Sequence, residues 1–193
     1  MIASLVLGVG FNSGKCPATH KHKLLREYDM WRGFLRRCYC PKVQKKQPTY
    51  VGCTVSENFK SYEYFYQWCQ SQIGFDQEGY HLDKDLLTPQ GKIYSEDTCV
   101  FLPQELNKLL NCKRKSRGNF PLGVDLQKGR YRSRFNFFGK SIDLGSFKTP
   151  EEAFLAYKQA KESYIKLQAE KWKALIDPRA YAALMAYEVL ATD

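Results

Sequence analysis

The segment Arg130–Phe137, RYRSRFNF, restricts the possible fold more than any other part of the chain. Its basic and polar side chains alternate with aromatic and small ones. Successive side chains of a β-strand point to opposite faces, so this alternation predicts a strand with one polar and one packed face. The polar face carries Arg130, Arg132, Arg134 and Asn136. Three guanidinium groups spaced about 6–7 Å apart along a strand are suited to bind phosphates and guanine edges.

The sequence around this strand predicts a small antiparallel sheet backed by a helix. Short strands separated by glycine-containing turns are expected in FPLGVDL, GRYRSRFNF and KSIDLGSF. Thr149 and Glu152 then form a capping-box pattern, with Pro150 in the first helical turn. The helix that they begin should run to residue 175 or close to it, and a last helix should end near Leu190.

Charge is distributed in blocks along the chain. The 30 Lys and Arg outnumber the 20 Asp and Glu, which gives a formal net charge of +10. Residues 15–48 and 113–148 are strongly basic, whereas residues 76–112 carry more acids than bases. Blocked positive charge favours a polyanionic partner over a surface that is basic only for solubility. We expect double-stranded DNA as that partner, and RNA remains an open alternative.

The N-terminal part of the sequence predicts a second mixed domain. Met1–Val9 is interpreted as a first strand, and helices are predicted over 24–38 and from 57 to Gly74, with a basic loop over 39–53 between them. Residues 79–110 follow the order strand, loop, strand, short helix, in which Pro103 is expected to begin the helix. The fold class is therefore α+β. The expected divisions are a domain at 1–112, a basic linker at 113–119 and a domain at 120–193.

Cysteine content and hydropathy indicate a cytoplasmic protein without a membrane partner. Seven cysteines, an odd number, favour reduced thiols over a disulfide framework. No stretch approaches the ~20 apolar residues of a membrane span. HKH at 20–22 and CYC at 38–40, with Cys53, could offer zinc ligands, but the one-residue gaps are unusual for zinc. Buried thiols are the favoured interpretation of these cysteines.

The segment PLGVDLQKGRYRSRFNFFGKSIDLGSFKTPEEAFLAYKQAK resembles the Apetala-two/ethylene-response-factor DNA-binding domain. The resemblance covers roughly residues 120–165 and rests on Gly123-Val124, the LGSF turn and the TPEEAFLAYKQA helix. In that family a three-stranded sheet, backed by one helix, lies in the major groove. The resemblance implies that the arginines of 130–137 lie on the reading sheet.

The same resemblance implies that Lys128 and Lys140 lie near phosphates. This chain departs from the family at two positions of the sheet. Asp125 follows Gly-Val where the plant domains usually have Arg, and Asp143 replaces a usual Trp. The base preference of the family is therefore not carried over.

The order of elements over 80–110 resembles the ββα-metal fold of HNH endonucleases. Together with an Apetala-type domain, it resembles the HNH homing endonucleases of phages and mobile introns. The segments WRGFLRRCYCPK and YVGCTVSENFKSYEYFYQW are similar to the lead-in segments of that family. The resemblance implies phosphodiester cleavage assisted by one hard divalent cation per site, Mg²⁺ or Mn²⁺.

The resemblance assigns site residues one at a time. Asp83 and Asn107 fall on the two metal-ligand positions, and Thr98 falls on a loop position that is usually Asn. Lys84 falls on the general-base His, although a lysine is protonated at neutral pH and cannot accept a proton. Two substitute bases are His81 and Asp85, provided that they lie close to the metal-bound water.

Three functions follow from these patterns. The leading hypothesis is a metal-dependent DNA endonuclease that nicks one strand at a site chosen by the C-terminal sheet. Its N-terminal helix would grip the DNA backbone through Arg32, Arg36 and Arg37. The second hypothesis is a non-cleaving DNA-binding or regulatory protein on the same scaffold, favoured by Lys84 and Thr98. In the alternative to a metal site, Asp83 and Asp85 only pair with Lys or Arg across domains. The third is a protein that blocks a host enzyme by direct contact.

Overall fold

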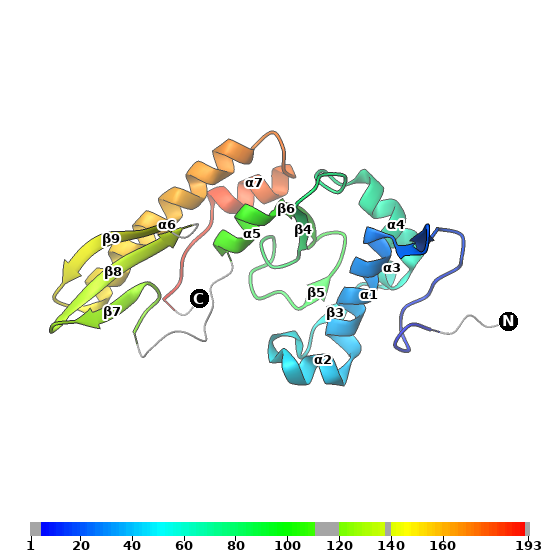
Figure 1. Ribbon diagram of the computed structural model, residues 1–193, viewed down its shortest axis with the longest axis horizontal. Coiled ribbons are helices and arrows are strands. Elements are labelled where there is room, and N and C mark those ends of the chain that lie inside the picture. Colours follow the sequence, from blue (N-terminus) through cyan, green and yellow to red (C-terminus); the bar gives the residue numbers. More distant parts are fainter. Residues whose placement is uncertain (1–4, 111–119, 138–139, 192–193) are drawn as a thin grey trace. The chain divides into compact units, whose positions relative to one another are not determined.

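The computed structural model describes residues 5–110, 120–137 and 140–191. The chain divides into two compact units, Met1–Pro103 and Gln104–Asp193, each of which combines helices with strands (Figure 1). The predicted α+β class is confirmed at this level. The division falls between a strand and the helix that directly follows it, and the predicted linker 113–119 lies outside the described residues.

The N-terminal unit contains short strands and helices. In chain order they are β1 (Thr19–His20), β2 (Lys23–Leu24), α1 (Arg26–Tyr39), α2 (Pro41–Lys46), the 3₁₀ turn η1 (Pro48–Tyr50), β3 (Thr54–Val55), α3 (Glu57–Lys60), α4 (Tyr62–Ser71), β4 (Tyr80–Asp83), β5 (Ile93–Tyr94) and β6 (Val100–Pro103). Strands β1 and β2 pair antiparallel, β3 and β5 pair parallel, and β4 and β6 pair antiparallel.

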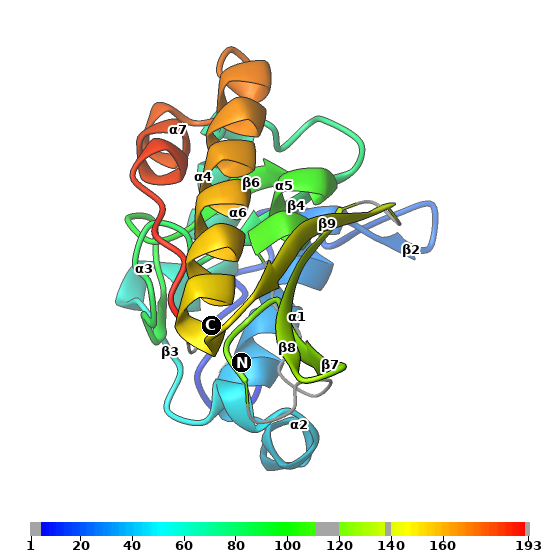
Figure 2. The same cartoon turned by 90° about the vertical axis from the view of Figure 1, so that its left-hand side faces the viewer.

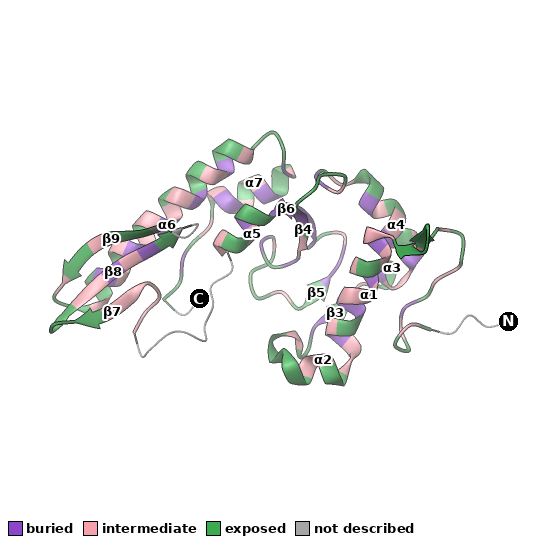
Figure 3. Cartoon of the chain, viewed as in Figure 1, coloured by how far each residue is buried: buried purple, intermediate pink, exposed green. Residues whose placement is uncertain are grey.

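Aromatic side chains of α1, α3 and α4 form the core of this unit. Trp31, Phe34, Phe59 and Phe65 are all fully buried, and the purple segments of Figure 3 show how burial follows these helices. The Phe34 ring meets the Phe59 and Phe65 rings at centroid distances of 6.0 and 5.0 Å. The Trp31 indole N–H donates to the Phe59 carbonyl at 2.9 Å, so the polar edge of this buried ring is satisfied.

The predicted helix from 57 to Gly74 was wrong in one respect, because it is interrupted at Ser61. The Phe11 N–H donates to the Lys60 carbonyl at 2.8 Å, and the Tyr62 N–H donates to the Phe11 carbonyl at 2.9 Å. Ser61 then caps α4 by accepting from the Tyr64 N–H. A backbone pairing with a segment fifty residues earlier thus divides one periodic stretch into α3 and α4.

Three further expectations for the N-terminal unit were wrong. In the described part of Met1–Val9, Val6 makes only an isolated bridge to Gly10, around a tight turn with Leu7 and Gly8 at positive φ. The expected basic loop after Cys40 instead contains helix α2, which Pro41 begins at a position where a missing N–H costs little. Pro103 ends β6 rather than beginning the next helix.

The C-terminal unit has the predicted sheet and helices. Its elements are α5 (Gln104–Leu110), β7 (Val124–Gln127), β8 (Arg130–Phe137), β9 (Lys140–Phe147), α6 (Pro150–Trp172) and α7 (Pro178–Met185). The strands form an antiparallel sheet in the order β7-β8-β9, and α6 lies along the sheet (Figures 1 and 2). The predicted capping box of α6 is present, whereas α7 ends at Met185, earlier than predicted.

Gly123 sets how closely the sheet approaches α6. Phe135 of β8, Tyr157 of α6 and Val189 form the buried cluster between sheet and helix. Gly123 has φ +76°, and a Cβ there would lie 2.0 Å from Cδ2 of Tyr157. Only glycine fits both this left-handed backbone and the close ring, which gives a physical reason for Gly-Val at the start of β7.

In the described part of the chain, no helix is both long enough and apolar enough to span a bilayer.

Candidate functional site

The face of the sheet that points away from the buried cluster is polar. Residues directly opposite each other on antiparallel strands share a face. The pairs on the polar face are Asp125↔Arg132, Gln127↔Arg130, Arg132↔Ser146, Arg134↔Asp143 and Asn136↔Ser141. We call these residues the polar face. On the other side Ser133 and Phe135 are buried, so the predicted alternation of β8 is confirmed.

A β-bulge interrupts the pairing of β8 with β9. Ser133 pairs with Gly145, and the next residue, Arg134, pairs with Asp143, so that Leu144 has no opposite residue. Gly145 has φ +112° beside this irregularity. Because one extra residue is inserted, Asp143 and Ser146 reach the same face although three positions separate them.

The guanidinium groups of the polar face are accessible. Arg130 and Asn136 are exposed, and the side chains of Arg132 and Arg134 keep 23% and 41% of their accessible surface. Arg130 donates through Nη2 to the Ser146 carbonyl at 3.1 Å. An accessible row of arginines on a rigid sheet is the feature that the sequence predicted for a nucleic-acid interface.

Asp125 organises two of these arginines. Arg132 donates from Nε to Oδ1 of Asp125 at 3.1 Å and from Nη2 to Oδ2 at 3.0 Å. Nη2 of Arg134 also donates to Oδ2 of Asp125. The hydrogen bond from Arg132 lowers the pKa of the Asp125 carboxyl from its ordinary value, and Arg134 adds to this effect. Asp125 is therefore ionised at neutral pH and accepts from both guanidinium groups.

The two lysines predicted near phosphates occupy different situations. Lys128 and Gly129 form the two-residue turn between β7 and β8, both with positive φ, and Lys128 is exposed at its tip. Such a turn matches the twist of the paired strands. The side chain of Lys140 lies outside the described part of the structure.

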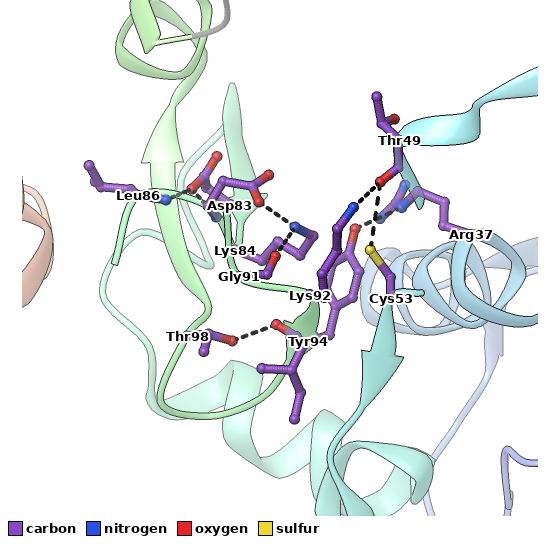
Figure 4. A network of polar contacts seen from close by, with 12 residues as sticks. Arg37, Thr49, Cys53, Asp83, Lys84, Leu86, Gly91, Lys92, Tyr94 and Thr98 are labelled. Carbon is purple, nitrogen blue, oxygen red and sulfur yellow. Dashed lines mark hydrogen bonds and ion pairs between the residues drawn. The ribbon is translucent and has the colours of Figure 1, made fainter. Parts of the chain in front are cut away.

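Only part of the predicted basic face of α1 is exposed to a DNA backbone. Arg36 is exposed, whereas Arg32 is half-buried with its guanidinium 5.8 Å from the centre of the Tyr28 ring. Arg37 donates from Nε to the Tyr94 hydroxyl at 3.0 Å and lies 5.5 Å from the ring centres of Tyr50 and Tyr94. Arg37 thus belongs to a contact network within the N-terminal unit (Figure 4).

Asp83, the predicted metal ligand, ends strand β4 opposite Val100. Its Oδ1 accepts the backbone N–H groups of Asp85 and Leu86 at 2.9 and 2.8 Å, which fixes the turn after the strand (Figure 4). Burial raises the pKa of the Asp83 carboxyl from its ordinary value, against the opposing effect of these N–H groups. One carboxylate oxygen is therefore committed to the backbone, and Oδ2 is left for another partner.

Lys84, at the predicted general-base position, points into the N-terminal unit. Its side chain is only 7% exposed. The ammonium donates to the Gly91 carbonyl at 2.9 Å and to Asp85, and it lies 5.6 Å from the centre of the Tyr94 ring. An ammonium held in this way fixes the loop before β5, and it does not present a base to solvent. Asp85 thus pairs with the adjacent lysine of its own unit, and the predicted pairing of Asp83 and Asp85 across domains stays a prediction.

The two substitute bases both face solvent. His81 is exposed on β4, two residues before Asp83 and therefore on the same face of the strand. The Asp85 side chain is 63% exposed, although it is paired with Lys84. Of the two, His81 shares the accessible side of the strand with Asp83.

Thr98 locks the loop between β5 and β6. Its hydroxyl accepts the Ser95 N–H at 3.1 Å and donates to the Ile93 carbonyl at 2.9 Å. In return, the Ser95 hydroxyl accepts the Thr98 N–H at 3.2 Å. Both residues are buried, so these bonds satisfy backbone groups that water does not reach. Thr98 therefore has a positioning role.

Replacing Thr98 by valine should lower the free energy of unfolding by about 1–3 kcal/mol, because the shape is kept while the buried Ser95 N–H and Ile93 carbonyl lose their partner. Thr98→Ser keeps the hydroxyl and should retain most of the stability. Urea unfolding followed by tryptophan fluorescence measures both variants. Unchanged stability in Thr98→Val would mean that the hydrogen bonds of the Thr98 hydroxyl do not stabilise this loop.

The second predicted metal ligand, Asn107, belongs to α5 and thus to the C-terminal unit, whereas Asp83 belongs to the N-terminal unit. Each of the two residues is therefore described within its own unit. Among the described residues no group of three or more His, Cys, Asp or Glu side chains gathers in a way that could hold a metal ion. Within the N-terminal unit, Oδ2 of Asp83 is the carboxylate oxygen of this position that is not committed to the turn, and a hard cation could bind it together with water and substrate phosphate.

Of the cysteines considered for zinc, Cys38 and Cys53 are buried, as predicted, whereas Cys40 is only half-buried. Their thiols contact the carbonyls of Thr54 and Thr49. Burial raises the pKa of Cys38 to about 12, so this thiol stays protonated at neutral pH and is a poor metal ligand.

Comparisons with protein-family models, with curated proteins and with solved structures found no match to this chain.

Two functional features were missed in the sequence. The role of Asp125 could have been found, because the two-residue turn Lys128-Gly129 fixes the register that sets Asp125 opposite Arg132. The contacts of Tyr94 with Arg37 and Lys84 join three distant segments, and no local pattern indicates them.

Proposed function

We propose that this chain is a double-stranded DNA-binding protein that reads base sequence through the polar face of sheet β7–β9. The observation that carries the proposal is the accessible guanidinium row of β8, with Arg132 and Arg134 held in fixed positions by Asp125. Arginine forks bind guanine edges and phosphates bidentately, and a β-ribbon can enter the major groove.

The composition of the polar face favours duplex DNA over single strands. Proteins that bind single-stranded DNA or RNA stack the bases on aromatic side chains. The residues of the polar face are Asp, Gln, Arg, Asn and Ser, and the described aromatic side chains of β8, Tyr131 and Phe135, alternate to the opposite side. Phe135, for example, is buried against Tyr157. The face therefore offers hydrogen-bonding groups for base edges and no stacking platform.

A binding selection tests this proposal. The full-length protein is incubated with duplexes whose central segment is randomised, and bound duplexes are recovered and sequenced over several rounds. We expect a defined motif to be enriched, and a gel shift with that duplex should resist competition by single-stranded DNA and by RNA. Affinity should fall with rising salt, because phosphate contacts release counterions. Recovery of no motif, or stronger binding to RNA, would overturn the proposal.

Metal-dependent DNA cleavage is a second candidate function, because the antiparallel pair β4–β6 has Asp83 at its end and helix α5 follows at once. This order is that of the ββα-metal fold, in which a bound divalent cation would stabilise charge on the scissile phosphate. The inward Lys84 and the structural role of Thr98 favour the non-cleaving alternative. No cleavage step is therefore derived.

A plasmid assay separates these two functions. If the chain is an endonuclease, supercoiled plasmid that carries the selected motif becomes nicked in Mg²⁺ or Mn²⁺ and stays intact in chelator. Asp83→Asn is the suitable variant, since its amide oxygen can still accept the Asp85 and Leu86 N–H groups while the charge is removed. It should abolish nicking and leave DNA binding unchanged. Intact plasmid with wild-type protein under all metal conditions would exclude cleavage.

A further inference from the structure

If the polar face binds duplex DNA, as proposed above, one of its two acids, Asp125, has a function of its own. We propose that Asp125 is a specificity-determining residue, which holds Arg132 by one edge so that the other edge reads guanine. The proposal rests on the way in which the carboxylate and the guanidinium meet, and it concerns a residue that departs from the family pattern.

A guanidinium group can donate two parallel hydrogen bonds from either of two edges, and Arg132 uses one of these edges, or forks, to bind Asp125. Arg132 donates to Asp125 from Nε at 3.1 Å and from Nη2 at 3.0 Å, which is the side-on fork. The end-on fork is made by Nη1 and the outer hydrogen of Nη2, because a guanidinium has five N–H donors in one plane. The end-on fork matches O6 and N7 of guanine, the pair of acceptors that this base presents in the major groove.

One carboxylate fixes two side chains of the polar face. Oδ2 of Asp125 accepts from Arg132 and also from Nη2 of Arg134. A free arginine must lose rotamer freedom when it binds a base, whereas these two are already held by the sheet. Because Asp125 is directly opposite Arg132, its position depends on the backbone register of β7 and β8 and not on a flexible loop.

The other charged groups of the polar face are held differently. Arg130 donates one hydrogen bond to the Ser146 carbonyl and is exposed, so it is suited to contact phosphate without selecting a base. Asp143 accepts the Gly145 N–H through Oδ1 at 2.9 Å, which is a local turn contact. The two acids therefore carry the same charge on the same face, but Asp125 alone of the two makes the side-on contact with Arg132.

The carboxylate also acts against binding to unrelated DNA. It places a negative charge beside Arg132 and Arg134, and this charge repels a phosphate that approaches them. A guanine that accepts from the end-on fork offsets this repulsion, whereas another base does not. Asp125 thus contributes to discrimination both by orienting Arg132 and by weakening non-specific binding, which is how selective interfaces reject wrong partners.

The test compares Asp125→Asn with Asp143→Asn, two variants that make the same charge change on the same face. The probes are the duplex obtained by selection, its single-base variants at each guanine, and an unrelated duplex. For Asp125→Asn we expect the preference for one guanine to fall at least fivefold, because a bidentate arginine–guanine contact gives about 5- to 150-fold discrimination. Affinity for the unrelated duplex should stay equal or increase.

Two control variants separate the contact between Asp125 and Arg132 from a simple loss of negative charge. Asp143→Asn should keep the guanine preference, and Arg132→Lys should lose it at the same base pair as Asp125→Asn, because lysine has no fork. Unchanged discrimination in Asp125→Asn, or equal loss in Asp143→Asn, would overturn this inference and leave DNA binding standing. If wild-type protein binds none of the duplexes, the proposed function itself fails. Circular dichroism spectra that match wild type establish that each variant is folded.

Discussion

Replacing Arg130, Arg132 and Arg134 together by alanine should reduce affinity for the selected duplex by at least about 100-fold, because each arginine that contacts a base contributes roughly 1–3 kcal/mol. The free energy of unfolding should change little, since all three side chains lie on the accessible face and the buried face of β8 is untouched. Fluorescence anisotropy with a labelled duplex measures the affinity, and thermal unfolding measures the stability.

The matched control removes the same amount of charge from another surface of the same unit. Three exposed lysines on α6 and just after it serve this purpose: Lys166, Lys171 and Lys173. The last two make ion pairs with Glu105 and Glu170 that are exposed to solvent, and such pairs contribute little to stability. Alanine at all three should weaken binding only slightly, through the general field of the protein. Equal losses in the two triple variants would refute a role for the polar face beyond net charge.

Replacing Gly123 by alanine should lower the free energy of unfolding of the C-terminal unit by about 2–5 kcal/mol, the sum of backbone strain and overpacking. The left-handed backbone at φ +76° disfavours any side chain, and the new methyl group would meet the Tyr157 ring at 2.0 Å. Tyr157 cannot easily move away, since it is packed with Phe135 in the buried cluster. Urea unfolding monitored by circular dichroism measures the change.

Gly129 separates the two causes of this destabilisation. It has φ +75°, nearly the same as Gly123, but nothing lies within 4 Å of a Cβ built at that position. Gly129→Ala should therefore show backbone strain alone, at about 1–2 kcal/mol. If both variants lose the same stability, the close approach of sheet and helix at Gly123 is not tight, and the position is glycine for its backbone only.

The C-terminal fold could be predicted in detail because its signals are local. The alternation of Arg130–Phe137 fixes both faces of a strand, and the Thr149–Glu152 capping box fixes where α6 begins. A two-residue turn leaves one register for the hairpin, so even the pair Asp125↔Arg132 was contained in the sequence. Each of these features depends on residues within a few positions of one another.

The predictions that were wrong for the N-terminal unit concern places where segments distant in the sequence meet. The break at Ser61 depends on the backbone of Phe11, and the periodicity of the sequence from 57 onward contains no sign of it. Glu27 is buried on α1, whereas Leu24, an apolar residue of the predicted helix 24–38, lies in β2 and is 47% exposed. A helical pattern gives the apolar stripe, but neighbouring elements decide which residues beside the stripe become covered.

The candidate cleavage site could be predicted as positions and not as chemistry. Asp83 does end a strand that is paired with β6, as the resemblance implied. The direction of Lys84 could not be foreseen, because it depends on the Gly91 carbonyl and on the Tyr94 ring that receives it. The sequence shows that a lysine follows Asp83, but not which carbonyl and which ring its ammonium meets.

The bulge at Leu144 gives strand β9 tolerance to evolutionary change in length. A chain that lacked this one residue would close the bulge and still place Asp143 opposite Arg134, because Leu144 has no opposite residue to lose. A deletion of Ile142 would instead close the bulge by moving Leu144 to the place opposite Arg134 and Asp143 to the place opposite Phe135, on the buried face. Descendants of this sequence should therefore lose the residue at 144 more readily than the residue at 142.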